Sequence, residues 1–178
     1  MTYVEKSRHY VEGVVAGVIP ACLYVRQACQ RQLDDLAEPP TGYRFDEARA
    51  SEICRFTELC KHIKGPLASR GETLKLEGWQ VFILTTVFGW VDENGNRRFR
   101  HVYIEVPRGN GKSALSSTVG LFMLALDGEA GAEVYSAATT RDQARIVFRD
   151  AQAMARKMPL FLSRMGIEVT AQAIVQAR

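Results

Sequence analysis

The sequence predicts an α/β fold, in which a helical N-terminal region leads into a parallel β-sheet with helices on both faces. Three observations support this prediction. Residues 2–70 show helical periodicity, the chain alternates strand–helix–strand–helix from residue 101 onward, and a glycine-rich loop joins the first of these strands to its helix. We therefore expect a helical region at residues 1–70 and a sheet-containing core at residues 71–178.

The N-terminal region predicts three helices. Apolar residues from Tyr10 onward share one helical face until Gly17, and a second apolar stripe ends at Pro39. Two helices with a short link indicate a helical hairpin. The third helix spans about residues 46–64 and stops at Gly65.

The pattern changes in the middle of the chain. Residues 78–90 are apolar nearly all round, which is typical of a helix packed on every side. Residues 92–96 form a turn, in which Asn94-Gly95 is a hairpin signal. Residues 101–106 are rich in β-branched and aromatic side chains, and this pattern predicts a buried parallel strand.

The remaining elements continue the alternation. We predict a helix at residues 112–126 and a second strand at residues 133–138. A capping box at residues 140–143 opens another helix, which Pro159 ends. Residues 167–170 are a candidate third strand.

The loop between the first predicted strand and its helix reads EVPRGNGKS. Its second half matches the phosphate-binding P-loop pattern G-x-x-x-x-G-K-[ST], but Val106 replaces the first glycine. The physical demands fall on the second half, where glycines let backbone N–H groups approach phosphate oxygens at a helix N-terminus. We expect a P-loop NTPase-type core that binds ATP through six residues: Arg108, Gly109, Asn110, Gly111, Lys112 and Ser113.

Three side chains of the loop have predicted roles. Lys112 would contact the β- and γ-phosphates, Ser113 would bind Mg²⁺, and Arg108 would pair with phosphate oxygens, so Lys112 and Arg108 are the candidate catalytic residues. The alternative is a strand-to-helix turn without a ligand, with Arg108 as a solvated charge. The strand before the loop and the helix after it favour the phosphate site.

The amino-acid composition excludes few classes of function. The net charge of +3 permits an acidic partner without arguing for one. Cys54, Cys60 and His62 match no zinc template, so we read the cysteines as buried thiols in a reducing cytosol. The charged N-terminus is a poor signal peptide, and no apolar stretch is long enough for a membrane span. We expect a soluble, intracellular protein.

Three arginines recur at every fourth position, at Arg141, Arg145 and Arg149, and therefore share one helical face. Such a row could contact DNA phosphates or the nucleotide of a neighbouring subunit. We favour the simpler interpretation, a solvated face on which Asp142 and Asp150 partner the arginines.

Several segments in order resemble the N-terminal part of the large subunit of tailed-bacteriophage terminases, the DNA-packaging ATPases. They are VEGVVAGVIPACLYVRQACQRQLDDL, YRFDEARASEICRFTELCKHIKG, LEGWQVFIL, EVPRGNGKS and VYSAATTRDQARIVFRDA. The resemblance spans essentially the whole chain. Such terminases have a P-loop without the usual first glycine, which would account for Val106. The family's adenine-contacting Gln lies at Gln80, whereas we expect the adjacent Trp79 to pack in the core.

The resemblance implies further properties. ATP and Mg²⁺ would be the cofactors, and the intact protein would package double-stranded DNA into procapsids in the host cell cytoplasm. A portal protein and a small terminase subunit would be partners, the motor would be a homo-oligomer, and no membrane would be involved. A helicase-like P-loop NTPase and a non-catalytic anion-binding or assembly module remain alternatives.

One motif of that family has no match. A Walker B strand, a short apolar run ending in Asp-Glu, should follow the P-loop, but Glu168 is the only acid after Asp150. We therefore expect a fragment with an incomplete sheet, truncated before Walker B. Weak nucleotide binding, little or no hydrolysis and a tendency to self-associate would follow.

Overall fold

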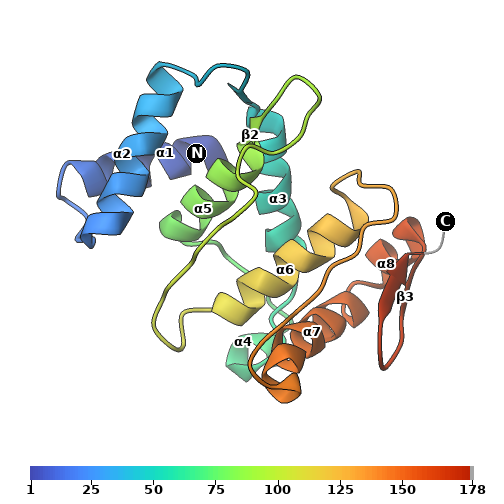
Figure 1. Cartoon of the computed structure of the whole chain (residues 1–178). Helices are drawn as coiled ribbons and strands as arrows, with labels where there is room; N and C mark the ends of the chain where they lie inside the picture. Colours follow the sequence, from blue (N-terminus) through green and yellow to red (C-terminus); the bar gives the residue numbers. More distant parts are fainter. Residues whose placement is uncertain (177–178) are drawn as a thin grey trace. The chain divides into compact units, whose positions relative to one another are not determined.

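The computed structural model describes residues 1–176, and these residues are helix-rich with two small sheets (Figure 1). The chain divides into two compact units that alternate along the sequence. The first contains residues 1–55 and 76–104, and the second contains residues 56–75 and the chain from Glu105 onward. The sequence predicted a different division, into a helical region at residues 1–70 and a core at residues 71–178, and that domain division stays a prediction.

The first unit is built on two helix contacts. Helix α1 (Tyr3–Val15) packs against α2 (Leu23–Ala37) and α5 (Gly78–Gly89), so the predicted helical hairpin and the predicted apolar helix are confirmed. The core at these contacts consists of Val11, Val14, Cys29 and Phe82.

Two buried hydrogen bonds and a capping carboxylate order this unit. The Thr85 hydroxyl of α5 donates to Ser7 Oγ at 2.9 Å, and Trp90 Nε1 donates to Gln32 Oε1 at 2.9 Å. Asp46 accepts hydrogen bonds from the first N–H groups of α3 (Glu47–Leu59), which begins in the first unit and whose last residues belong to the second.

The first sheet is a short antiparallel pair. Strand β1 (Arg44–Phe45) pairs with β2 (Trp90–Val91), in the register Arg44 to Val91. The turn after β2 is confirmed where Asn94-Gly95 predicted it, because Asp92 N–H donates to the Asn96 carbonyl and Gly95 has φ of 80°.

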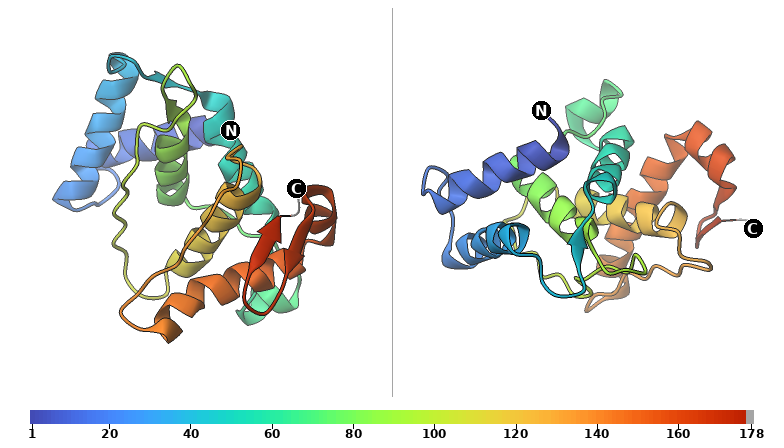
Figure 2. Two further views of the ribbon diagram at one scale, coloured as in Figure 1. Left: turned by 45° about the vertical axis from the view of Figure 1, so that its right-hand side comes forward. Right: turned by 90° about the horizontal axis from the view of Figure 1, so that it is seen from above.

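The second unit contains the remaining elements. They are α4 (Gly65–Ser69), α6 (Lys112–Ala125), α7 (Arg141–Arg156), α8 (Pro159–Met165), β3 (Ile167–Val169) and β4 (Ile174–Gln176). Helices α6 and α7 lie side by side, and β3 and β4 form an antiparallel hairpin that follows α8 (Figures 1 and 2). Sequence analysis did not predict the short helix α8, although Pro159 suits its first turn.

The described residues do not form the predicted parallel sheet, and both of their small sheets are antiparallel. Residues 101–106 and 133–138, which were predicted as buried strands, have no regular secondary structure, and the strand predicted at 167–170 pairs antiparallel. Tyr103 is 86% exposed and Tyr135 is 82% exposed. A β-rich sequence forms a strand only where a neighbouring backbone pairs with it, and among residues 1–176 neither segment belongs to one of the two strand pairs.

Within the part of the chain that the structure describes, no helix combines the length and apolar character that crossing a bilayer requires.

Candidate nucleotide-binding site

The glycine-rich loop and α6 form the candidate site, and all of its residues belong to the second unit. Gly109 has φ of 92° and Gly111 has φ of 72°, whereas no non-glycine residue of the described chain has positive φ. The backbone therefore alternates in sign of φ from Arg108 to Gly111. Such alternation turns successive N–H groups toward one side and makes an anion-binding concavity.

Gly111 also determines where the helix starts. It is the N-cap of α6 in the left-handed conformation, and its carbonyl accepts the first helical hydrogen bond, from Leu115 N–H at 2.9 Å. A residue with a side chain would be strained there. The backbone therefore shows why the second half of the motif needs glycine, as the sequence predicted.

The N–H groups of the loop are available as donors. Within residues 1–176, none of the main-chain N–H groups from Arg108 to Ser113 makes a hydrogen bond of good geometry to another protein group. The first N–H groups of any α-helix lack internal partners, and they mark the positive end of its dipole. The loop thus presents unsatisfied donors where an anion would relieve them.

Two side chains close the loop on itself. Lys112 Nζ donates to the Val106 carbonyl at 2.9 Å, and Asn110 Nδ2 donates to the Pro107 carbonyl at 3.1 Å. Both contacts stabilise the curved backbone. They use carbonyl acceptors, so they leave the main-chain N–H groups of the loop unoccupied.

The loop brings two positive charges and one hydroxyl together. Arg108 and Lys112 are exposed and Ser113 is half-buried. These residues fit the phosphate chain of a nucleotide, whose oxygens accept hydrogen bonds and carry negative charge. For Mg²⁺ the described residues offer the Ser113 hydroxyl, and they contain no cluster of three His, Cys, Asp or Glu side chains that could hold a metal.

Gln80 lies in the first unit, near the start of α5, so the structure does not bring it together with the loop as one defined site. Its side-chain oxygen accepts a hydrogen bond from Glu77 N–H at 2.9 Å, as part of a capping box. The amide nitrogen of Gln80 stays available as a donor. Its contact with adenine therefore remains a prediction.

Two residues that support α6 were not singled out from the sequence. Ser117 Oγ lies 2.8 Å from the Ser113 carbonyl and 2.9 Å from the Val147 carbonyl, which links α6 to α7. Thr118 Oγ1 lies 3.3 Å from Thr57 Oγ1 in the core of the second unit. Together with Ser116, both residues lie between apolar neighbours in the middle of α6, and these polar positions were the available signal.

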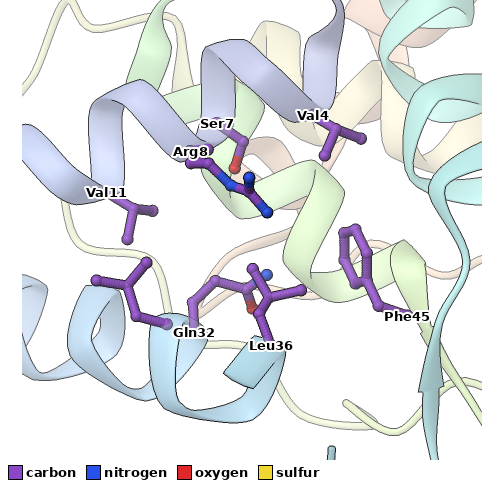
Figure 3. Close-up of a pocket in the computed structure, with 8 residues that line it drawn as sticks. Val4, Ser7, Arg8, Val11, Gln32, Leu36 and Phe45 are labelled. Atoms are coloured by element: carbon purple, nitrogen blue, oxygen red, sulfur yellow. The ribbon is translucent and has the colours of Figure 1, made fainter. Parts of the chain in front are cut away.

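A cleft in the first unit does not have this chemistry. It lies between α1, α2 and β1 and is lined mainly by apolar side chains (Figure 3). Arg8 reaches over it from α1, while Gln32 and Leu36 lie on the α2 side. The Gln32 side-chain oxygen already accepts a hydrogen bond from Trp90. Arg8 is the one charged residue among those that line the cleft. We assign the cleft no ligand.

The fold is helix-rich with small sheets, consistent with an α/β protein, and a glycine-rich loop precedes the N-terminus of α6. A family model for the terminase large subunit, ATPase domain, matches residues 78–178, which is more than half of the chain. The chain therefore belongs to this family, and the predicted membership is confirmed. No curated protein and no solved structure gives a significant match to the chain.

Proposed function

We propose that residues 108–113 bind the triphosphate of ATP together with Mg²⁺, and that the intact protein uses ATP hydrolysis to package double-stranded viral DNA into procapsids. The observation that carries the proposal is the run of main-chain N–H groups from Arg108 to Ser113, which make no hydrogen bond of good geometry within residues 1–176, inside a chain of the terminase ATPase family. Portal protein, a small terminase subunit and further copies of the chain in the host cytoplasm are the partners proposed by family membership.

The residues of the loop divide the work of binding. The N–H groups from Arg108 to Ser113 donate to phosphate oxygens, and the ammonium group of Lys112 leaves the Val106 carbonyl to contact the β- and γ-phosphates. Arg108 offers a guanidinium fork to the same anion. Ser113 supplies one oxygen ligand to Mg²⁺, which neutralises phosphate charge when bound.

The predicted parallel sheet is also part of this proposal. Residues 101–106 and 133–138 have strand-forming sequences but belong to neither of the two small sheets of the described residues. We propose that both become strands of a parallel sheet when further strands are present. A catalytic acid pair is absent from the sequence after the loop, so hydrolysis by this chain should be slow even where binding occurs.

Titration of the chain with Mg²⁺–ATP by isothermal calorimetry tests the proposal. The chain should bind one nucleotide, and Lys112→Ala should weaken binding at least tenfold, because the substitution removes the charge that faces the phosphates. Lys75→Ala is the matched control, since Lys75 is an exposed lysine of the same unit outside the loop. Equal binding by the wild type and Lys112→Ala would overturn the proposal.

Two further titrations separate ATP recognition from simple anion binding. Inorganic tripolyphosphate should bind more weakly than ATP, because it lacks the base that Gln80 is proposed to contact. Gln80→Leu should reduce the preference for ATP over tripolyphosphate. If both ligands bind equally to the wild type, the site is an anion site, and the non-catalytic alternative is supported instead.

A further inference from the structure

Helix α7 carries a row of three arginines, Arg141, Arg145 and Arg149, which we call the arginine row. Successive members are four residues apart, so they lie on one face and rise about 6 Å per step, or about 12 Å in all. Arg141 and Arg149 are exposed and Arg145 is half-buried. The row therefore presents a linear positive charge two turns long.

Among the residues that the structure describes, no acidic side chain forms an ion pair with the row. Asp150, expected from the sequence to be a partner, is buried, and its carboxylate accepts a hydrogen bond from Lys64 Nζ at 2.6 Å. Asp142 is exposed, and the structure gives it no ion pair among residues 1–176. The three arginines likewise have no ion pair or aromatic contact within the described chain.

The packing of α7 fixes the direction of the row. Ala151, Met154 and Ala155 are buried on another side of the helix, and the Val147 carbonyl contacts Ser117 of α6. Beyond the row, Gln152 is buried, and its amide donates to the Thr170 carbonyl next to β3. The arginine row therefore occupies the first two-thirds of α7, and Arg156, at the end of the helix, is exposed but lies outside the row.

An unpaired row of like charges at four-residue spacing disfavours the helix that carries it, and a bound polyanion would relieve that repulsion. A single small anion could reach only part of a row about 12 Å long. One strand of a nucleic acid duplex presents a phosphate every 3.4 Å along its axis, so about three phosphates fall within the same length. Guanidinium groups can bind such phosphates through paired hydrogen bonds.

We propose that the arginine row is a docking surface for the phosphate backbone of double-stranded DNA, and that it reads no base sequence. The exposed positions of α7 within and beside the row are occupied by Arg, Asp, Gln and Ile, and the aromatic residue of this segment, Phe148, is half-buried. The surface is distinct from the nucleotide loop. It rests on the proposed function, because DNA packaging is what makes a duplex the relevant polyanion.

The test is fluorescence anisotropy of a labelled 30-base-pair duplex at several salt concentrations. The variant Arg141→Gln/Arg145→Gln/Arg149→Gln should bind at least tenfold more weakly, and the slope of log affinity against log salt should fall by about 2.7, since each phosphate contact contributes about 0.9. The matched control replaces three exposed arginines elsewhere by Gln, namely Arg26, Arg55 and Arg164. Both variants lower the net charge from +3 to 0 by removing three positive charges.

The control should retain most of the wild-type affinity and salt slope. Equal losses in the two variants would show that net charge alone drives binding, and an unchanged row variant would show that the row is not used; either result overturns the proposal. Single substitutions, each expected to lower the slope by about one, provide the same test if the triple variant fails to fold. Polyglutamate binding that equals duplex binding, and that is lost in the row variant, would instead identify an acidic protein surface as the occupant.

Failure here and failure of the nucleotide proposal are distinguishable. The row variant should bind Mg²⁺–ATP as the wild type does, since none of its residues lies in the loop. A wild-type chain that binds Mg²⁺–ATP but no duplex would remove the docking surface and leave the nucleotide site intact.

Discussion

The Lys64 ammonium group lies 2.6 Å from the buried carboxylate of Asp150, and this contact joins the start of α4 to α7 within the second unit. The two partners differ in environment, because the Lys64 side chain is 71% exposed whereas that of Asp150 is 10% exposed. The carboxylate is therefore largely removed from water, whereas its ion-pair partner Lys64 is exposed to solvent screening. Removing Lys64 and removing Asp150 should therefore change the stability of the second unit by different amounts.

We predict that Lys64→Ala destabilises the second unit by about 1 kcal/mol, because it leaves a desolvated carboxylate without its partner, while the exposure of Lys64 limits the loss. The double variant Lys64→Ala/Asp150→Asn should be more stable than Lys64→Ala alone, since the buried charge is then gone. Urea unfolding followed by far-ultraviolet circular dichroism measures both effects. A double variant less stable than Lys64→Ala would contradict the explanation.

The start of α3 depends on Asp46, whose carboxylate accepts hydrogen bonds from the Ala48 and Arg49 N–H groups at 3.1 Å each. The N–H of Arg49, and then the side chain of Arg44, lower the pKa of Asp46. Asp46→Ala should cost about 1 kcal/mol at pH 7, as is usual for a helix N-cap. Glu47→Gln, which changes a neighbouring acid that does not cap, should cost much less.

The pKa shift of Asp46 also predicts a pH dependence. A group whose pKa is lower in the folded state stabilises the fold above its unfolded value, about 3.9, and loses that contribution as the pH falls through the folded value. The stability difference between wild type and Asp46→Ala should therefore be constant near neutral pH and shrink below about pH 4. A difference that grows on acidification would exclude the capping role.

Helices were predictable from sequence because their evidence is local. The stripe that contains Val11 and Val14 and the cap at Thr140 report on contacts made within the same segment. Of the predicted capping box only the Thr140 half forms, because the Gln143 side chain accepts from the Thr139 hydroxyl instead. Strands 101–106 and 133–138 failed because their formation depends on distant backbone partners, which a strand-like pattern does not reveal. Helix boundaries near Gly65 were also approximate, because α3 ends at Leu59.

The candidate site was partly predictable for the same reason. Gly109 and Gly111 have the positive φ values that the motif requires, so the loop shape follows from its sequence. The contact between Lys112 and the Val106 carbonyl could not be foreseen, since any residue offers that carbonyl. The partner of Asp150 was misread, because Lys64 is distant in sequence and the nearby arginines fitted helical spacing.

The four cysteines should differ sharply in reactivity. Cys22 is exposed, whereas Cys29, Cys54 and Cys60 are buried. Burial raises the pKa of the Cys29 thiol to about 11 and that of Cys60 to about 12, so neither forms appreciable thiolate near neutral pH. Ellman's reagent at pH 8 should titrate one thiol in the native chain and four in guanidinium chloride. Rapid labelling of more than one native thiol would contradict the described core.

The central claim is that main-chain N–H groups from Arg108 to Ser113 surround a phosphate chain at the start of α6. Two-dimensional ¹H–¹⁵N NMR of the labelled chain during titration with Mg²⁺–ATP tests it most directly. The amide signals of residues 108–113 should shift together with one saturating dissociation constant, and in Lys112→Ala the same shifts should require at least tenfold higher ligand concentrations. Saturable binding that shifts amides elsewhere while these six stay unchanged would contradict the account.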